Sequence, residues 1–587
     1  MLPGAGLVHR RLAVLDPEPR SNQPFGDRRR WLVFNGEIYN FRELRSQIGG
    51  REWKTTGDTE VLLAAYGEWG ERCVDHLNGM YAFAVWDERE QSLFLARDRM
   101  GQKPLYFAVS RNGDGIGALA FASEIGALLN VEWVHRGMDR ESLVEYLRWG
   151  YVAGAGTFYL GIGQLMPGQT ARVTSKGILF GSHAQNPHPG PPPGYRERGQ
   201  EGGDAVGLTR GFVEQAVRRQ LVTDVPLGCF LSGGVDSSIM AAAMKAAGGV
   251  NGRVLTFSIG FDEAEYDETP FAAEVAAYLG TEHRQLIMRP DAAEDLPRIA
   301  AAFGEPMADS SALPTYHLAR FARQHIKVAL SGDGGDELFG GYDRYRAMRL
   351  MQRTGQWPWR LARRLMNLAP GTDPKRLPAR LKRLVDSAAL PHATAYSHIM
   401  RMFDESLIGS LMVSPPMVRG ADWIEQEFEM ESKGRELAMA AMAVDRRTYL
   451  PGDLLTKVDR CSMAFALEVR SPFMDHELVA FAAGLEAGVV MSGGIKPLLR
   501  HAFAADLPAA VFKRRKMGFA VPIGRWLRTS LRGMLNDLVF ASDSFAGEYF
   551  RKETIETMIA EHQEERRDHS QRLYALMMLE LWKRKSS

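Results

Sequence analysis

The sequence predicts a two-domain protein: an N-terminal α+β sandwich of packed sheets with flanking helices over residues 1–180, and a C-terminal α/β domain with a parallel sheet over residues 207–587. Its 587 residues exceed one ordinary core, since domains run to roughly 100–200 residues. Short β-rich runs fill the first part, whereas strands alternate with helices in the second. Residues 181–206, rich in Gly and Pro and without an apolar period, are interpreted as a linker.

The N-terminal domain is predicted from short strands bounded by Asp, Gly or Asn turns. Residues 31–38 (WLVFNGEI) form a strand, and Asn40 caps the helix that follows it, FRELRSQI. Residues 59–69 have helical spacing. Further strands are expected at residues 80–86, 93–96, 104–109 and 119–122.

Beyond the linker, apolar strands alternate with helices. The strands are VPLGCFL, VLTFSIGF, HRQLIM and IKVALSG, and the helices include SSIMAAAMKAA and ETPFAAEVAAYLG. Near-continuous apolar strands of this kind indicate a parallel sheet covered on both faces. After Tyr342 the pattern is mostly helical, and we assign no function to the charged segment from about Arg551.

Charge and cysteine content exclude several classes of protein. The 72 basic and 71 acidic residues leave a net charge of +1, which provides no long-range field for nucleic acid or an anionic membrane. We find no signal peptide, and no apolar run approaches the roughly 18–20 residues of a membrane span. Cys73, Cys229 and Cys461 lack CxxC spacing, so neither a disulfide framework nor a structural zinc site is expected. A cytoplasmic protein is the expectation.

The strongest chemical motif is SGGVDSS, which lies between strand VPLGCFL and a helix. Glycines let the backbone approach an oxyanion, and the helix N-terminus adds partial positive charge. The candidate ligands of an anion are Ser232, Gly233, Gly234, Ser237 and Ser238. Asp236 would repel a phosphate, so a bridging Mg²⁺ is its natural partner. The loop is neither a Walker motif nor GxGxxG, and the alternative is a strand–helix turn without a ligand.

Two further segments suit the same chemistry. SGDGGDELFGGY follows strand IKVAL and begins with Ser331 and Gly332. Its acids Asp333 and Asp336 would stand at the carboxyl edge of the sheet, unless the segment is only a solvated acidic turn. KRRKMGF, which includes Lys516, would neutralise charge near a reacting phosphate, unless it is a solvated basic turn.

Together these strings, with LLTKVDRCSMAFALEVRSPFMD and GGIKPLLR, resemble the synthetase domain of the glutamine-hydrolysing asparagine synthetase family. The N-terminal part resembles the class II glutamine amidotransferase domain of that family in six strings: HRRLAVLD, FNGEIYN, GDTEVLL, LNGMYAFAVWD, LARDRMGQKPLYF and FASEI. The likeness covers nearly the whole chain except residues 181–206. It implies an N-terminal fold of the Ntn-hydrolase type and a C-terminal fold of the ATP pyrophosphatase type. It also implies ATP and Mg²⁺ as cofactors, and a homodimer as a possible assembly.

The resemblance implies an activity and residue roles. The N-terminal domain would release ammonia from glutamine, and the second domain would use ATP to convert aspartate to an acyl-adenylate that ammonia attacks. Arg11 would bind the carboxylate of glutamine, Asn35 and Gly36 would form an oxyanion hole, and Glu37 and Asp58 would hold its α-amino group. The corresponding positions for the nucleotide are Leu231, Ile259, Ser331 and Gly332; for Mg²⁺, Asp236 and Asp336; for the adenylate, Lys516. Asp333 stands where some relatives have the longer Glu.

The sequence departs from the family at its start. Family glutaminase domains use an N-terminal cysteine as the nucleophile, and this sequence has no equivalent cysteine at its start. The three cysteines that are present are interpreted as core residues. We therefore expect ammonia, not glutamine, to serve the chain as printed. Either the start is misassigned, or the glutaminase is degenerate, as in β-lactam synthetases. We favour the former because Arg11, Asn35, Glu37 and Asp58 are all present.

Other readings of the function remain open. The same adenylation could act on a sugar acid, a peptide carboxylate or the precursor of a β-lactam ring. A non-enzymatic glutamine- or nucleotide-binding scaffold is a third possibility, although the intact SGGVDSS, SGDGGDE and RRKMGF strings argue against it.

Overall fold

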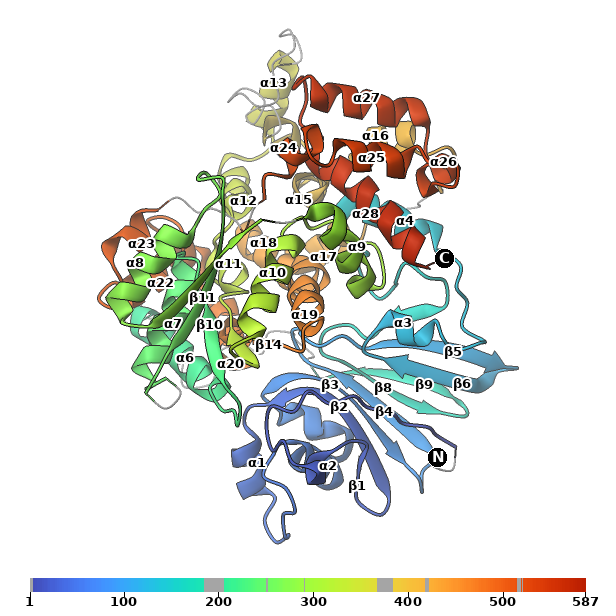
Figure 1. Ribbon diagram of the computed structural model, residues 1–587, viewed down its shortest axis with the longest axis vertical. Coiled ribbons are helices and arrows are strands. Elements are labelled where there is room, and N and C mark those ends of the chain that lie inside the picture. The colour runs from blue at the N-terminus through green and yellow to red at the C-terminus, as the bar shows by residue number, and fades with distance from the viewer. Residues whose placement is uncertain are drawn as a thin grey trace.

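The computed structural model describes residues 4–183, 205–249, 252–289, 291–366, 384–416, 422–514, 519 and 521–586. Its N-terminal part contains two antiparallel sheets (Figure 1). The larger has the strand order β1 (Phe25–Gly26), β2 (Arg30–Ile38), β3 (Gly79–Asp87), β4 (Ser92–Arg97), β8 (Gln169–Thr174) and β9 (Gly177–Ser182). The smaller has the order β6 (Gly115–Ala122), β5 (Tyr106–Asn112) and β7 (Ile162–Gln164).

The larger sheet is covered on both faces, which explains its apolar strands. Helices α1 (Phe41–Gln47) and α2 (Thr59–Trp69) pack on one face, where Phe34 and Leu62 share a buried cluster. On the other face, residues such as Val33 and Ala84 meet Leu105 and Phe121 of the smaller sheet. Alternate residues of one strand therefore point into different cores. The result is the predicted sandwich of sheets with flanking helices.

The C-terminal part is built on a five-stranded sheet in which every pair of neighbours is parallel. Its order is β12 (Glu282–Met288), β11 (Leu255–Phe261), β10 (Leu227–Phe230), β13 (Val328–Leu330) and β14 (Glu468–Arg470). Helices α6 (Ala205–Gln220), α7 (Val235–Ala246) and α8 (Thr269–Leu279) form one helical layer, and α9 (Ala292–Phe303), α10 (Ala312–Arg323) and α19 (Thr456–Met463) form another (Figure 1). The predicted two-part architecture and the parallel sheet are confirmed.

The remainder of the chain is largely helical, as predicted. These elements are α11 (Gly335–Phe339), α12 (Asp343–Thr354), α13 (Trp357–Met366), α15 (His392–Met400), α16 (Glu405–Leu411), α17 (Trp423–Glu431), α18 (Leu437–Arg447), a π-helical turn (Leu450–Leu455), α20 (His476–Ala483), α21 (Ala487–Met491), α22 (Pro497–Ala502), α23 (Ala509–Lys513), α24 (Ile523–Arg528), α25 (Arg532–Val539), α26 (Phe545–Tyr549), α27 (Lys552–Gln563) and α28 (Ser570–Ser586).

Three features differ from the sequence-based expectation. Strand β14 was not anticipated, because its three residues Glu-Val-Arg have no apolar run. Helix α4 (Arg140–Trp149) and strands β7 to β9 were also missed. Asn40 does stand at the start of α1, but its side chain makes no cap hydrogen bond. It instead accepts from the backbone N–H of Asn78 and donates to the carbonyl of His76, so it ties α1 to the turn before β3.

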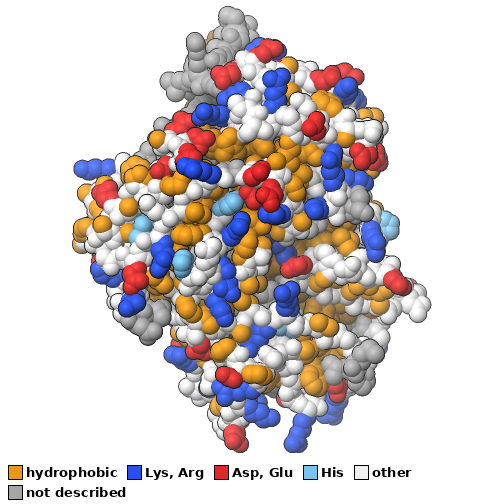
Figure 2. Space-filling model, viewed as in Figure 1, with side chains coloured by type: hydrophobic (Ala, Val, Ile, Leu, Met, Phe, Trp, Pro, Cys, Tyr) orange, Lys and Arg blue, Asp and Glu red, His pale blue; other side chains and the backbone are white. Residues whose placement is uncertain are grey.

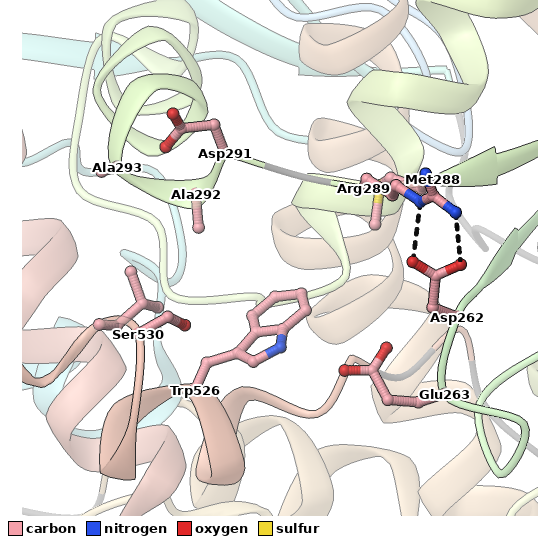
Figure 3. A pocket seen from close by; sticks show the side chains of 10 residues that line it. Asp262, Glu263, Met288, Arg289, Asp291, Ala292, Ala293, Trp526 and Ser530 are labelled. Atoms are coloured by element: carbon pink, nitrogen blue, oxygen red, sulfur yellow. Dashed lines mark hydrogen bonds and ion pairs between the residues drawn. The ribbon is translucent and has the colours of Figure 1, made fainter.

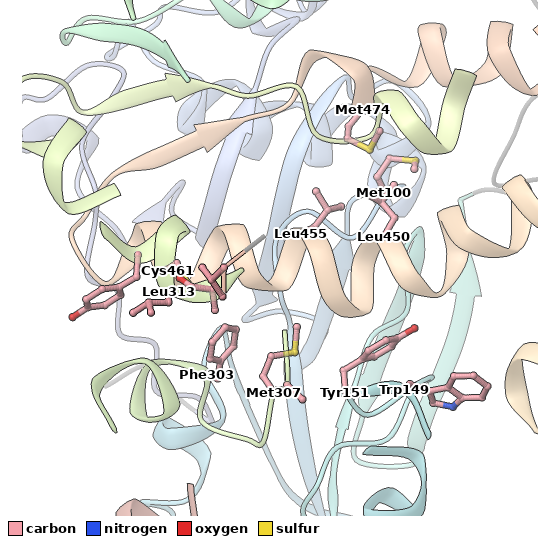
Figure 4. Packing of buried hydrophobic residues seen from close by; sticks show 14 of the residues in the cluster. Met100, Trp149, Tyr151, Phe303, Met307, Leu313, Leu450, Leu455, Cys461 and Met474 are labelled. Atoms are coloured by element: carbon pink, nitrogen blue, oxygen red, sulfur yellow. The ribbon is translucent and has the colours of Figure 1, made fainter. Parts of the chain in front are cut away.

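Residues 140–159 share their core with the C-terminal end of the chain. The hydroxyl of Tyr146 donates to the carbonyl of Ala575 at 2.7 Å, and the rings of Phe158 and Trp582 meet edge to face with centroids 4.6 Å apart. In Figure 1 helices α4 and α28 lie side by side. Figure 4 shows Met100 near Leu450, Leu455 and Met474, and Tyr151 between Met307 and Trp149. One hydrophobic core therefore spans both halves of the sequence.

Surface charges of both signs are interspersed on the face shown in Figure 2. Basic side chains alternate there with acidic and apolar ones, in keeping with the near-zero net charge. Among the described residues, no helix combines the length and apolar character needed to cross a membrane. The predicted linker, residues 181–206, falls mainly on residues 184–204, outside the described residues.

Candidate active site: two glycine-rich loops at the edge of the parallel sheet

The SGGVDSS loop connects the end of β10 with the start of α7. The hydroxyl of Ser237 accepts from the backbone N–H of Ser232 at 3.1 Å and lies 3.0 Å from the hydroxyl of Ser232. Gly233 has φ = +73°, and a Cβ there would lie 2.7 Å from the backbone of Phe271, so only glycine fits. Gly234 is the residue that precedes α7. Ser232 and Ser237 of the loop thus bond to each other, and the N-terminus of α7 follows directly after Gly234.

Ser238 lies apart from the other loop serines. It is fully buried, and its hydroxyl has no hydrogen-bond partner among the described residues. Leu231 and Ile259 are also buried, at the ends of β10 and within β11, where the N–H of Leu231 donates to the carbonyl of Phe257. These two apolar side chains lie on neighbouring strands, just after β10 and in the second half of β11.

The SGDGGDE loop follows β13, the strand adjacent to β10, and lies against SGGVDSS. A Cβ on Gly332 would lie 2.8 Å from the Cβ of Asp236, and one on Gly335 would lie 2.5 Å from its carboxylate oxygen. Glycine at both positions is therefore what lets the two loops touch. The structure brings together segments that stand about a hundred residues apart in the sequence.

The carboxylates of Asp236 and Asp336 converge on one buried lysine that the sequence analysis did not assign. The ammonium of Lys496 pairs with Asp236 and lies 2.7 Å from Asp336. Lys496 is 2% exposed and has φ = +50°, immediately before α22. Burial opposes its charge, but the two acids together raise its pKa. The only sequence signal was its place in the GGIKPLLR string.

Two hard oxygen donors this close suit a magnesium ion. Mg²⁺ usually binds through one or two carboxylates, and substrate phosphates and water complete the octahedron. Among the described residues, no cluster of three or more His, Cys, Asp or Glu side chains could hold a metal by itself. The pair Asp236 and Asp336 has the right donor chemistry for an ion that arrives with phosphate groups. The residues present therefore fit the group that the sequence implies.

Asp333 faces a second unassigned lysine. Its carboxylate accepts from the hydroxyl of Ser331 at 2.7 Å. Burial raises its pKa, and the charge of Lys457 opposes that rise. The Lys457 ammonium itself donates to Asp309 and to the hydroxyl of Ser311, each at 2.7 Å. Asp333 is thus a desolvated acid with a nearby positive charge, just after β13.

Of the basic segment KRRKMGF, Lys516 lies outside the described residues. Arg514, two positions earlier, is described and reaches the first loop. Its guanidinium donates to the carbonyl of Ser232 at 3.2 Å and to Glu268 at 2.8 Å. The start of the basic segment therefore lies beside SGGVDSS.

A corner of the antiparallel sandwich

The glutamine-related residues of the sequence analysis gather where β2 meets the loop before α2. Asn35 and Gly36 lie opposite Ala82 and Tyr81 on β3. Gly36 has φ = +141°, and a Cβ there would collide with the carbonyl of Met80. Glycine is therefore required where the two strands approach.

Two buried acids lie next to each other in this corner. Asp58 accepts from the N–H of Ile38 at 2.9 Å, next to Glu37 on β2. Burial raises the pKa of Asp58 to about 6. Burial, followed by repulsion from Glu468 and Asp58, raises the pKa of Glu37 well above its ordinary value. Such acids gain strongly from a cationic ligand.

The guanidinium of Arg11 supplies a hydrogen-bond donor near Asp58. One of its terminal nitrogens, Nη2, donates to the carbonyl of Asp16 at 2.8 Å. The other, Nη1, is buried and has no hydrogen-bond partner among the described residues. An unpaired guanidinium nitrogen is well suited to an incoming carboxylate.

The three cysteines are all free and buried, as predicted. Burial raises the pKa of each thiol, to about 12 for Cys229. Because the thiolate is the nucleophilic form, none of them is a candidate nucleophile.

A cavity at the open end of strands β11 and β12

A cavity of about 530 Å³ lies at the same edge of the parallel sheet. Arg289, just after β12, is paired with Asp262 at 2.9 and 3.4 Å on one side, and Trp526 of α24 lies across from them (Figure 3). Asp291 and Ser530 also line it. None of the residues predicted from sequence lines this cavity.

Comparison with known proteins

The fold joins an antiparallel sandwich to a parallel sheet with two glycine-rich loops at its edge, and comparison with known proteins gives the class of protein. Residues 208–584 match the asparagine synthase family, and residues 2–183 match a glutamine amidotransferase domain. The chain therefore belongs to the asparagine synthase family. It is a carbon–nitrogen ligase of the glutamine-hydrolysing asparagine synthetase type, which performs ATP-dependent amidation.

The similarity to known proteins extends over nearly the whole chain. It is 31% identical to asparagine synthetase [glutamine-hydrolyzing] 1 of Bacillus subtilis, over 98% of this chain and 89% of that protein. It is 34% identical to a putative asparagine synthetase [glutamine-hydrolyzing] of Mycobacterium bovis, over 97% of this chain and 88% of that one. A third relative, 27% identical over 91% of this chain and 83% of its own, is amidase chry2 of Gibberella zeae.

Proposed function

We propose that the protein amidates the side-chain carboxylate of aspartate to give asparagine through a β-aspartyl-adenylate. The observation that supports this most directly is the contact between SGGVDSS and SGDGGDE, which places phosphate-binding and acidic groups at one edge of the parallel sheet. In this proposal residues 207–587 form a synthetase domain of the ATP pyrophosphatase type, and residues 1–180 form a glutaminase domain of the Ntn-hydrolase type.

In the proposed nucleotide site, the pyrophosphate part of ATP lies on the SGGVDSS loop. The glycines give it backbone N–H groups, and the start of α7 adds partial positive charge. The ligands of ATP would be Leu231, Ser232, Gly233, Gly234, Asp236, Ser237, Ser238, Ile259, Ser331 and Gly332. Asp236 and Asp336 would hold Mg²⁺, which supplies charge neutralisation on the phosphate oxygens when bound.

In the reaction, an oxygen of the aspartate carboxylate attacks the α-phosphorus of ATP, and pyrophosphate leaves. The lone pair of ammonia then attacks the acyl carbon, AMP leaves, and the nitrogen loses a proton. Asp333, whose pKa is raised by burial, is the proposed acceptor of that proton. Lys516 is proposed to neutralise the charge of the adenylate, a role that Arg514 would support from its place beside Ser232.

We propose that the corner of the sandwich binds glutamine. The unpaired nitrogen of Arg11 would take the carboxylate, Glu37 and Asp58 the α-ammonium, and the Asn35–Gly36 pair the oxyanion. Because all three cysteines are buried, the 587-residue chain as printed would take its nitrogen from free ammonia.

The test is asparagine formation from aspartate, ATP and Mg²⁺ with either ammonium chloride or glutamine. Asparagine, AMP and pyrophosphate should appear in equal amounts with ammonium. Glutamine-dependent synthesis by this same chain would refute the ammonia-only proposal. Absence of ATP–pyrophosphate exchange with aspartate would refute the proposal that aspartate is the acceptor.

A second candidate keeps the chemistry but changes the acceptor to a sugar acid, a peptide carboxylate or a β-lactam precursor. The cavity beside β11 and β12 favours it, because about 530 Å³ is of the size that holds a small organic ligand. One relative is named an amidase, and that name also supports an acceptor other than aspartate. Exchange of pyrophosphate with such an acid, but not with aspartate, would select this alternative.

A further inference from the structure

Arg470 is the fully buried side chain that joins the two candidate sites. It lies on β14, yet it contacts two residues at the end of β2 in the sandwich. Its guanidinium carbon is 5.5 Å from the ring centre of Tyr39, and its Nη2 is 3.6 Å from Glu37. Arg470 therefore reaches from the parallel sheet into the proposed glutamine site.

The guanidinium is hydrogen-bonded through Nε and Nη1, whereas its Nη2 faces Glu37 without a hydrogen bond. Its Nε donates to Glu468 at 2.8 Å, and its Nη1 donates to the carbonyls of Gln220 and Val222 at 2.7 and 2.8 Å. Nη2 and the facing oxygen of Glu37 have no hydrogen-bond partner among the described residues. A buried guanidinium nitrogen and a buried carboxyl oxygen thus face each other at 3.6 Å, just beyond hydrogen-bond distance, and leaving both without a hydrogen bond is costly.

The backbone of Arg470 continues to the nucleotide site. Its carbonyl accepts from the N–H of Ser331 at 2.8 Å, and the hydroxyl of the next residue, Ser471, is 3.0 Å from that of Ser331. Arg470 pairs in register with Leu330, the last residue of β13 before the SGDGGDE loop. A shift of β14 would therefore move the first residue of that loop.

We propose that Arg470 is a positioning residue through which bound glutamine alters the nucleotide site. The α-ammonium of glutamine would give Glu37 a second cation, and the facing guanidinium would adjust through Nη2, which has no hydrogen bond among the described residues. Its carbonyl and Ser471 would pass that adjustment to Ser331. This inference rests on the proposed glutamine and ATP sites.

The experiment measures pyrophosphate release by the full chain at saturating aspartate and ammonium chloride, with ATP varied and glutamine present or absent. Ammonia from any glutamine hydrolysis then adds nothing. Glutamine should change the KM for ATP by about fivefold. Because coupling of binding is reciprocal for a given pair of ligands, ATP in the absence of aspartate should change the Kd of glutamine in calorimetry by the same factor as glutamine changes the Kd of ATP.

Two variants test the route, and a third serves as control. Arg470→Lys keeps the charge but cannot hold both carbonyls, and Ser471→Ala removes only the link to Ser331. Both should reduce the effect of glutamine to less than about 1.5-fold. Asp459→Asn breaks the other buried pair between the halves, Lys103 to Asp459 at 3.0 Å, without touching Ser331. It should lower Tm and keep the coupling.

An unchanged KM for ATP in the wild-type chain with saturating, calorimetrically verified glutamine would overturn the inference. So would equal loss of coupling in Asp459→Asn, since the effect would then follow general stability. Asparagine formation from ammonium in these same assays tests the proposed function separately, because it needs no glutamine.

Discussion

At the scale of single residues, the site depends on buried charges that need partners. Lys496 neutralises Asp236 and Asp336, so removing it leaves two carboxylates facing each other. We expect Lys496→Met to lower the free energy of unfolding by about 2–4 kcal/mol in the absence of divalent ions. This loss is smaller than that for breaking a fully buried ion pair, because the side chains of Asp236 and Asp336 are 22% and 19% exposed.

At a constant concentration of pyrophosphate, which supplies the phosphate oxygens, millimolar Mg²⁺ should restore most of this stability, because the ion would take the place of the ammonium between the carboxylates. Urea unfolding with and without Mg²⁺ measures both effects, and Lys496→Arg, which keeps the charge, is the matched control. Equal losses with and without Mg²⁺ would show that the two acids do not form an ion site.

If Asp58 binds glutamine as proposed, glutamine binding should depend on pH. Burial raises its pKa to about 6, so below pH 6 the free protein carries it protonated. Only the carboxylate attracts the α-ammonium, so the Kd of glutamine should be constant above pH 7. It should weaken by up to about tenfold per unit below pH 6. Calorimetry between pH 5 and 8 checks this, and Asp58→Asn should lose the part of the slope that belongs to Asp58, while Glu37, whose pKa burial also raises, keeps its own part.

At the scale of elements, β2 and β3 depend on Gly36. Gly36→Ala places a Cβ against the carbonyl of Met80 at φ = +141°, and we expect a loss of about 2–4 kcal/mol in the free energy of unfolding. Gly177→Ala on β9 is the control, since nothing lies within 4 Å of a Cβ there, and it should be nearly neutral. Similar Tm values for both variants would contradict this account of the strand pair.

The sequence predicted those elements whose physics is local. Helix α2 was placed at residues 59–69 as observed, because its apolar spacing is regular. Loop SGGVDSS was recognised because strand, glycines and helix are contiguous. Strand β14 and Lys496 were not, since each acquires its role only from a neighbour far along the chain: β14 from β13, and Lys496 from Asp236 and Asp336. Asn40 was misjudged because a distant turn competes for its side chain.

At the scale of the whole molecule, the division suggested by composition differs from the division of the core. Residues 140–159 pack under α28 through Tyr146, Phe158 and Trp582. A fragment of residues 205–587 should therefore be poorly soluble and melt well below the full chain, because it exposes that contact surface. Co-expression with residues 1–183 should restore it. A fragment with the Tm of the full chain would show that the shared core is dispensable.

The pairing of α4 with α28 also has a consequence for synthesis. A ribosome delivers residues 140–159 long before residues 570–586, yet these segments complete one core. The apolar residues of α4 that contact α28 therefore stay exposed through more than half of translation, and the first half of the chain cannot complete its hydrophobic core alone. The nascent protein must be shielded over that interval, so its yield in a cell should depend on chaperones that hold apolar surfaces more than on its final stability.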